Sequence, residues 1–168
     1  MILTVTPSEI DGVRCIVPGV SEDYRGYYIE TYNEAEYRSA GIDVAFVQDD
    51  ISVSRRHVIR GLHGDDGTWK LISCLMGEIY LVVLDCRPNS ARKGLWSAFT
   101  ISDRNRMQVL VPPGVANGHL ILSERAIFHY KQSAYYNPNG QFTVKWNDPR
   151  YGIRWPVATP ILSPRDFA

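Results

Sequence analysis

The chain has 168 residues, of which 45% are hydrophobic and 21% charged, and its 18 basic side chains are balanced by 18 acidic ones. This length predicts a single domain spanning residues 1–168, and the composition is that of a globular protein rather than a disordered segment. A formal net charge of zero gives no overall field that attracts polyanions, so we expect no nucleic-acid partner, and any anion site must be a local basic cluster.

No apolar run reaches the length of a membrane span, and the N-terminal segment has neither the basic start nor the apolar core of a secretion signal. We therefore expect a cytoplasmic protein with no membrane partner. The three cysteines, Cys15, Cys74 and Cys86, form neither a CxxC pair nor an even set, which argues against a disulfide framework or a zinc knuckle. Cys74 and Cys86 lie in apolar segments and are predicted to be small core residues.

The first part of the chain predicts a strand over residues 13–18, a polar turn over 21–26 and a second strand over 27–32, which is rich in aromatic and β-branched residues. Asn33 is a suitable N-cap for a short helix over 34–40, and Gly41 is a typical C-terminal stop. We expect this to be the main helix of the protein.

From residue 44 onward, apolar segments of strand length recur with turn residues between them. The predicted strands cover 44–53, 57–62, 69–75, 78–86, 95–101, 107–111, 118–122, 126–133 and 141–145. Turns rich in Gly, Pro, Asn or Asp are predicted at 64–67, 87–90, 112–114 and 137–140. Many short strands without intervening helices predict an all-β sandwich or barrel, and the proline-containing segment after residue 148 predicts an irregular tail that wraps it.

A cluster of basic side chains lies between residues 58 and 72. Arg60, His63 and Lys70 bring a guanidinium, an imidazole and an ammonium close together along the chain. A neutral imidazole can take a proton while fixed cations hold the negative charge that develops. The cluster therefore predicts proton-abstraction chemistry with His63 as the base; solvated surface cations are the alternative interpretation of Arg60 and Lys70.

The predicted strand over residues 126–133 offers a second candidate group. Side chains alternate between the two faces of a strand, so Phe128, Tyr130 and Gln132 share one face while His129 and Lys131 share the other. Only one of these sets can point into a barrel.

The run Arg60-Gly61-Leu62-His63, followed by Lys70-Leu71, resembles the active-site core of the dTDP-4-dehydrorhamnose 3,5-epimerase family, small cupin-like enzymes of sugar-nucleotide metabolism. Further blocks match in the same order along nearly the whole chain, at residues 22–26, 46–49, 77–79, 111–114, 130–131, 146–149 and 152–156. The resemblance implies a cupin-like double-stranded β-helix (jelly-roll) barrel with one or two short helices. It also implies an epimerase, without a cofactor, that inverts carbon 3, carbon 5 or both of a nucleoside-diphosphate 4-keto-6-deoxy sugar in cell-surface polysaccharide or deoxysugar biosynthesis.

The resemblance also implies roles for individual residues. His63 is the general base, Asp166 is the carboxylate that orients it, and Lys70 and Arg60 stabilise the enolate. Tyr130 is the acid that delivers a proton to the opposite side of the sugar, which places His129 and Lys131 outside the barrel. An exposed acid near the chain end is the alternative for Asp166, and a core aromatic residue is the alternative for Tyr130.

Substrate-binding positions are implied by the same resemblance. Arg25, with Tyr27 and Glu30, matches a segment that in the family's homodimers reaches into the neighbouring subunit's site, where an arginine can bind a diphosphate. Gln48 and Tyr136 correspond to positions near the nucleotide, where a planar ring can stack on the base. A homodimer with a shared site is therefore expected.

Two departures from the family pattern affect the expected substrate. The usual Pro-x-Gly-Phe-Ala-His-Gly is replaced here by residues 113–119, so that Asn117 stands in place of the pocket histidine, and His119 on the same strand face could partly substitute for it. Asp50 stands where the family usually has asparagine, and a carboxylate can accept both adjacent N–H donors of guanine. These features, with a shortened loop between His63 and Lys70, resemble the branch that acts on GDP-linked 4-keto-6-deoxy-heptoses in capsule synthesis. The sequence leaves GDP and dTDP both open.

Other functions remain as alternatives. A metal-dependent oxygenase would use a His-x-His pair, whereas His63-Gly64-Asp65 lacks the second histidine, so no metal site is expected. A non-catalytic sugar-binding barrel would need aromatic platforms but no aligned base and acid. A 3,4-ketoisomerase of similar fold would move the ketone instead of inverting a carbon.

Overall fold

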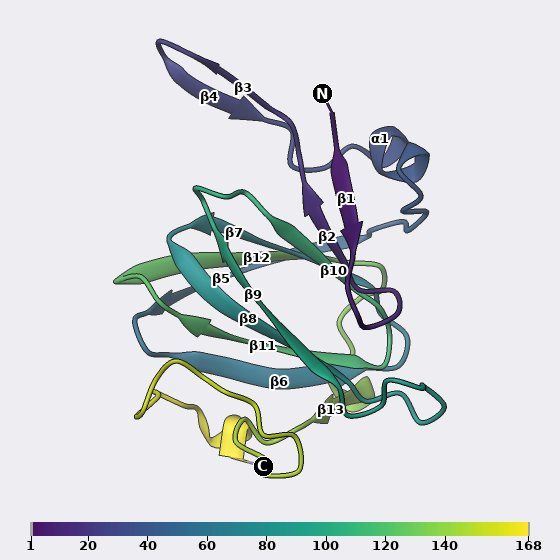
Figure 1. Ribbon diagram of the computed structural model, residues 1–168, viewed down its shortest axis with the longest axis vertical. Coiled ribbons are helices and arrows are strands. Elements are labelled where there is room, and N and C mark those ends of the chain that lie inside the picture. The colour runs from purple at the N-terminus through teal and green to yellow at the C-terminus, as the bar shows by residue number, and fades with distance from the viewer. Residues whose placement is uncertain (1, 168) are drawn as a thin grey trace.

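The computed structural model describes residues 2–167, and its regular secondary structure is mostly β-strand, arranged mainly in two facing sheets (Figure 1). The larger sheet has the strand order β1-β2-β10-β7-β12-β5, and the smaller has the order β13-β6-β11-β8-β9. A separate hairpin, β3-β4, projects from one end of the barrel (Figure 1). The all-β prediction is confirmed.

The larger sheet and the hairpin contain β1 (Thr4–Pro7), β2 (Arg14–Val17), β3 (Val20–Asp23), β4 (Gly26–Ile29), β5 (Gln48–Arg55), β7 (Lys70–Met76), β10 (Gln108–Val111) and β12 (Arg125–Gln132). The smaller sheet contains β6 (Ile59–Asp65), β8 (Glu78–Asp85), β9 (Trp96–Ser102), β11 (Val115–Ile121) and β13 (Gln141–Thr143). The helical elements are α1 (Glu34–Ser39) and two single-turn helices, η1 (Pro138–Gly140) and η2 (Pro164–Phe167).

The main core lies between the two sheets, because each strand directs alternate side chains inward. Ile72 of β7, Leu81 of β8 and Val109 of β10 are completely buried or nearly so in this layer. The outer face of the larger sheet is covered by α1 through Tyr37, which packs with Leu71 and the neighbouring residues. The C-terminal tail covers the outer face of the smaller sheet, where Trp155 packs in a cluster around Leu62.

The predicted caps of the main helix are confirmed. The Asn33 side chain accepts hydrogen bonds from the backbone N–H groups of Ala35 and Glu36, and Gly41 adopts a φ of +82° just after the helix ends. All three cysteines are free; Cys74 is buried and Cys86 partly buried.

Several sequence-based boundaries are wrong. The turn predicted over 21–26 is instead a hairpin in which β3 pairs with β4, and the strand expected up to residue 32 ends at Ile29. Strand β1 was not predicted, and Val44–Val47 lies outside β5. Gly64 was assigned to a turn but lies within β6, where a Cβ would come within 2.4 Å of the Phe142 ring on the paired strand β13. Gly64 therefore permits close side-chain packing rather than a change of chain direction.

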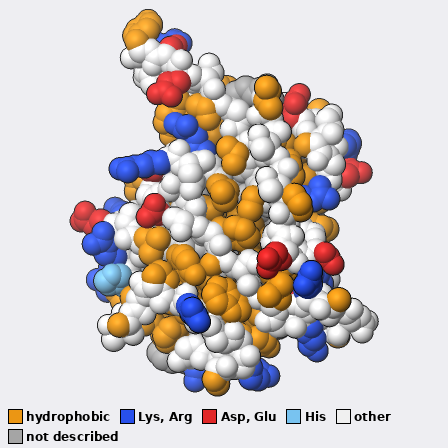
Figure 2. Space-filling model, in the orientation of Figure 1, with side chains coloured by type: hydrophobic (Ala, Val, Ile, Leu, Met, Phe, Trp, Pro, Cys, Tyr) orange, Lys and Arg blue, Asp and Glu red, His pale blue; other side chains and the backbone are white. Residues whose placement is uncertain are grey.

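Basic and acidic side chains are interspersed on the face shown in Figure 2, in agreement with the balanced charge of the sequence. Among residues 2–167, no helix is both long and apolar enough to cross a membrane.

Candidate active site

A pocket opens at one end of the space between the two sheets and collects most of the residues singled out from the sequence. The larger sheet contributes Lys70 and Tyr130, and the smaller sheet contributes Arg60, His63 and Asn117. The remaining lining residues are Ile51, Ser52, His119, Phe128, Gln132, Tyr136, Gln141 and Arg165.

His63 lies on β6 between two hydrogen-bonding partners. Its Nε2 atom is 3.3 Å from Oδ1 of Asp166, and its Nδ1 atom is 3.3 Å from the hydroxyl of Thr143, which is its direct neighbour on β13. A carboxylate only accepts hydrogen bonds, so the proton of the neutral ring belongs on Nε2 and the lone pair on Nδ1. Asp166 thus selects the tautomer in which Nδ1 is the basic atom.

Asp166 is buried, with 2% of its surface exposed, so the alternative interpretation of Asp166 as an exposed terminal acid is wrong. Its Oδ1 accepts the Gly61 N–H, and its Oδ2 accepts both the N–H and the hydroxyl of Ser163. Burial works to raise the pKa of this carboxyl, but these hydrogen bonds hold it below its ordinary value. Asp166 is therefore a fixed negative charge beside His63.

The local backbone at Gly61 makes this arrangement possible. Gly61 has a φ of +112°, and a Cβ there would lie 2.6 Å from the Cα of Gly118 on the adjacent strand. Only glycine combines this conformation with so close an approach of two strands. The Gly61 N–H is consequently free to bind Asp166 at the place where the register between β6 and β11 shifts.

The electrostatics keep His63 neutral. Burial, together with the positive charges of Arg165 and Lys70, outweighs the attraction of Asp166 and lowers the pKa of His63 to about 4. At neutral pH the imidazole therefore has a free lone pair, which a general base requires.

Lys70 is almost fully buried, so the interpretation as a solvated surface cation is wrong for it. Its Nζ lies 3.5 Å from Oδ1 of Asn117, and burial lowers its pKa, with Asp65 acting in the opposite direction. Arg60 is more exposed and donates from Nε to the Ser54 hydroxyl at 3.0 Å. Both cations border the pocket, where each can face a developing negative charge.

Tyr130 faces the pocket from the sheet opposite His63, as the strand alternation and the family resemblance together predicted. Burial, with Asp50 and Tyr136 nearby, raises the pKa of its phenol, so the group keeps its proton at neutral pH. His129 and Lys131 lie on the outer face, where both approach Asp49.

Gln48, Asp50 and Tyr136 form a chain of hydrogen bonds beside the pocket. The Tyr136 N–H donates to Oε1 of Gln48 at 2.9 Å, and the Gln48 amide donates to Oδ2 of Asp50 at 2.7 Å. Gln132 donates to the same Asp50 oxygen at 2.8 Å. Tyr136 borders the pocket, whereas Gln48 and Asp50 support it from behind.

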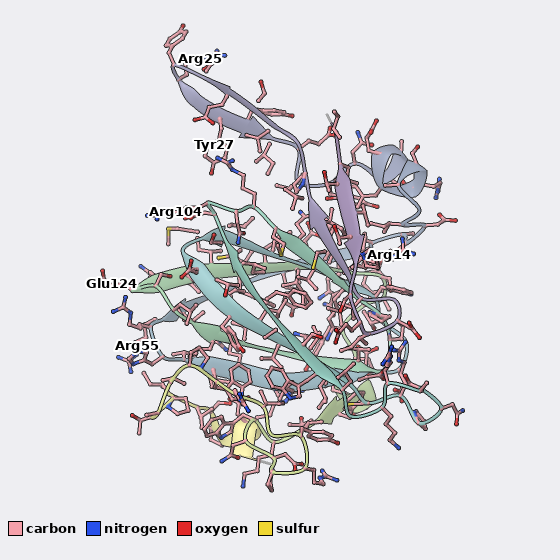
Figure 3. All side chains as sticks on the ribbon, viewed as in Figure 1. Arg14, Arg25, Tyr27, Arg55, Arg104 and Glu124 are labelled. Carbon is pink, nitrogen blue, oxygen red and sulfur yellow. The ribbon has the colours of Figure 1, made fainter. Side chains whose placement is uncertain are left out.

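Arg25, Tyr27 and Glu30 do not reach the pocket of their own chain. Figure 3 shows Arg25 at the far tip of the β3-β4 hairpin, where its guanidinium forms a 2.6 Å ion pair with Asp23. The Arg106 guanidinium lies 4.3 Å from the Tyr27 ring centroid, and Glu30 accepts a hydrogen bond from Asn33.

Sequence reasoning missed several residues of the site. Arg165, Gln132, Gln141 and Ser52 border the pocket, and Thr143 contacts His63. Arg165 precedes Asp166 in the sequence and could have been noticed, but nothing in the tail's pattern shows that it folds back over β6. Among residues 2–167, no group of three or more His, Cys, Asp or Glu side chains could hold a metal ion.

A buried His–carboxylate pair, an opposed tyrosine and fixed cations inside a β-barrel define an enzyme that moves protons on a carbon acid. A family model described as dTDP-4-dehydrorhamnose 3,5-epimerase matches residues 7–168. The enzyme of that name from Methanothermobacter thermautotrophicus is 41% identical over 95% of this chain and 89% of its own length. The one from Escherichia coli is 39% identical over 98% of this chain and 91% of its own length.

The solved structures agree. The epimerase of Legionella pneumophila, crystallised with dTDP-4-keto-L-rhamnose, has a TM-score of 0.93 and 36% identity, covering 98% of this chain and 90% of that one. The chain belongs to the dTDP-4-dehydrorhamnose 3,5-epimerase family and has its cupin-like jelly-roll fold. It is a sugar-nucleotide epimerase, an isomerase of deoxysugar metabolism that acts at carbon 3, carbon 5 or both of a 4-keto-6-deoxy sugar.

Proposed function

We propose that His63 removes the proton from a carbon beside the ketone of a nucleoside-diphosphate 4-keto-6-deoxy sugar, and that Tyr130 returns a proton to the opposite face of that carbon. The C–H electron pair moves to the ketone oxygen to form an enolate, and it returns to carbon as the new C–H bond forms. The observation that carries this proposal is that His63 and Tyr130 come from opposite sheets and face the same pocket.

The contacts of His63 with Asp166 and Thr143 support its role as the base, with a separate task for each ring nitrogen. Asp166 accepts the Nε2 proton, so Nδ1 takes the proton from the substrate carbon, and the Thr143 hydroxyl occupies Nδ1 until the sugar binds. The ring becomes an imidazolium beside the Asp166 carboxylate, which stabilises the new positive charge. After inversion, His63 has gained a proton and Tyr130 has lost one, and exchange with solvent restores both.

Three cations divide between the enolate and the diphosphate. Lys70 is the most buried of them, so its attraction to a developing oxyanion is weakened least by solvent, and we assign it to the ketone oxygen. Arg60 and Arg165 are exposed at the pocket mouth, where guanidinium groups suit the two phosphates.

For the nucleotide we propose dTDP. The Asp50 carboxylate, one of the features behind the GDP interpretation, already accepts hydrogen bonds from Gln48 and Gln132. The relatives described above are named for dTDP-sugars. GDP, as in the heptose branch of capsule or lipopolysaccharide synthesis, is the alternative, and Tyr136 would stack on either base.

We further propose that residues 1–168 act as one domain in a cytoplasmic homodimer. The projecting hairpin exposes Tyr24, Tyr27 and Tyr28, and the larger sheet exposes Ile51 and Val53, more apolar surface than a monomer needs. Placing the hairpin over the pocket of a second copy would bring Arg25 to the bound diphosphate.

The direct test is incubation with dTDP- and GDP-linked 4-keto-6-deoxy sugars in deuterated water, followed by NMR. We expect deuterium at carbon 3, carbon 5 or both, with inverted configuration, and no exchange with His63→Ala. Migration of the ketone would identify a ketoisomerase, and binding without exchange would identify a sugar-binding barrel.

A further inference from the structure

Two buried polar side chains in the pocket wall have no hydrogen-bond partner among residues 2–167. These unpartnered atoms are the two ring nitrogens of His119 and the hydroxyl oxygen of Ser52. Both residues border the pocket that contains His63 and Tyr130, and His119 is only 2% exposed. Burying polar atoms without partners is unfavourable, so such atoms in a pocket wall point to a polar ligand.

Each of these two residues lies next to Phe128, and they come from opposite sheets. The His119 ring on β11 is stacked on the Phe128 ring, with centroids 3.9 Å apart and an interplanar angle of 9°. Ser52 on β5 is directly opposite Phe128 in the strand register, which brings their Cβ atoms within about 5.5 Å. The stacking fixes the imidazole plane, so His119 presents its ring edge in a fixed direction.

The charge state of His119 selects the kind of ligand. Burial and the positive charge of Arg60 lower the pKa of His119 to about 3, so the ring is neutral, with one N–H donor and one acceptor nitrogen. The Ser52 hydroxyl can likewise donate and accept. A phosphate or an enolate oxygen only accepts hydrogen bonds, so it would leave the acceptor nitrogen of His119 without a donor. A sugar hydroxyl can donate to that nitrogen and accept a hydrogen bond from Ser52.

We propose that His119 and Ser52 form a hydroxyl-recognition subsite, which binds one hydroxyl of the sugar and sets which sugars the enzyme accepts. The inference rests on the proposed function, since it requires the sugar to lie in this pocket. The subsite takes no part in proton transfer. The hydroxyl comes either from carbon 2 of the sugar ring or from a longer side chain on carbon 5, as in a heptose.

The test compares His119→Phe and Ser52→Ala with the unmodified enzyme on three substrates: dTDP-4-keto-6-deoxyglucose, its 2-deoxy analogue and a GDP-linked 4-keto-6-deoxy-heptose. For a substrate with the recognised hydroxyl, kcat/KM for deuterium exchange should fall about five- to fiftyfold in each variant. For one without it, kcat/KM should change less than twofold. If kcat/KM falls in the variants for the two sugars that have a hydroxyl on carbon 2 but not for the 2-deoxy analogue, the subsite binds the ring hydroxyl. If kcat/KM falls only for the heptose, the subsite binds the hydroxyl of the side chain on carbon 5. Equal losses on all three substrates would overturn the subsite.

Thermal unfolding separates recognition from a structural role. Phenylalanine keeps the stack on Phe128 but removes the two unpartnered nitrogens, so the unliganded His119→Phe protein should have a higher Tm than the unmodified protein. The pH dependence of the remaining exchange should keep its acid limb, because His63 still removes the proton. A lower Tm, or a shifted acid limb, would show a structural or proton-transfer role and overturn the proposal.

His129→Phe is the matched control, because it makes the same change on the outer face of β12 and should leave the discrimination among the three sugars unaltered. If the unmodified protein exchanges none of the three substrates, the proposed function fails. If it exchanges them and His119→Phe behaves like the unmodified protein, only the subsite fails.

Discussion

Nε2 of His63 lies 3.3 Å from Oδ1 of Asp166, a carboxylate that three further hydrogen bonds from Gly61 and Ser163 hold in place. The tail that carries Asp166 packs over β6 and contributes both the charge that orients the base and Arg165 at the pocket mouth. The C-terminal segment is therefore part of the site.

Loss of the base should abolish exchange. His63→Ala should reduce deuterium incorporation at every exchangeable carbon by at least about 10³-fold, because no other neutral base in the pocket is paired with a carboxylate. NMR of the sugar in deuterated water measures this, and circular dichroism checks the fold. Near-normal exchange in a folded variant would refute the assignment of His63.

The pKa of His63 sets the acid limit of activity and affects stability. Because burial lowers this pKa to about 4, kcat/KM should remain high well below pH 6.5 and fall only near pH 4. The unfolded chain binds the proton near pH 6.5, so the stability contributed by the neutral ring is complete above that pH and is lost as the pH falls toward 4. Denaturant titrations between pH 4 and 7 should show that the free energy of unfolding depends on pH differently in the unmodified protein and in His63→Phe. The same pH dependence in both proteins would contradict the lowered pKa of His63.

Asp166→Asn should change both rate and pH dependence. The Asp166 charge works to raise the pKa of His63, so its removal should move the acid side of the pH–rate profile to lower pH. The maximal rate should also fall by roughly 10²-fold, because Asp166 no longer holds His63 in the tautomer that the reaction needs. An exposed acid elsewhere, as in Glu124→Gln, serves as the control (Figure 3). An unmoved profile would remove Asp166 from the proton-transfer pathway.

Tyr130→Phe should separate exchange from inversion. His63 can still remove the proton and return a deuteron to the same face, so incorporation continues while the inverted product falls by at least about 10²-fold. The phenol's raised pKa also predicts that the unmodified enzyme keeps its inversion activity through pH 9. Full inversion in Tyr130→Phe would show that another group delivers the proton.

In the proposed homodimer, Arg25→Ala should weaken substrate binding in the pocket of the second subunit. We expect KM to rise about tenfold, with dimer mass unchanged in light scattering, whereas Arg92→Ala in a distant exposed loop should behave like the unmodified enzyme. Mixed dimers of Arg25→Ala and His63→Ala should regain activity, because one pocket then has an intact base and an intact neighbouring arm. No gain on mixing would argue against the shared site.

Substitution of Asp50 tests which nucleotide the enzyme prefers. Calorimetric titration should give tighter binding of dTDP than of GDP, with Asp50→Asn weakening both by a similar factor, since its carboxylate supports Gln48 and Gln132. Tighter binding of GDP, with the difference reduced by Asp50→Asn, would instead restore the guanine interpretation.

Local patterns in the sequence determined the strand-rich class, the caps of α1 and the division of the β12 side chains into two faces, because each depends on neighbouring residues. The family resemblance, and not the local pattern, indicated which of the two faces points inward. Side-chain alternation and capping act over a few positions and can be read directly. The order of motifs also identified the family and His63, Lys70 and Tyr130 as candidates.

The tertiary structure decided what depends on distant segments meeting. The burial of Asp166 and the position of Arg165 require the tail to fold over β6, and the contact of Thr143 with His63 requires β13 to pair with β6. No local periodicity encodes either of these long-range contacts. Gly64 was read as a turn because its constraint comes from Phe142 on another strand. The two unpartnered side chains beside Phe128 become visible only when both sheets are in place, because burial is a property of the packed molecule and not of the segment.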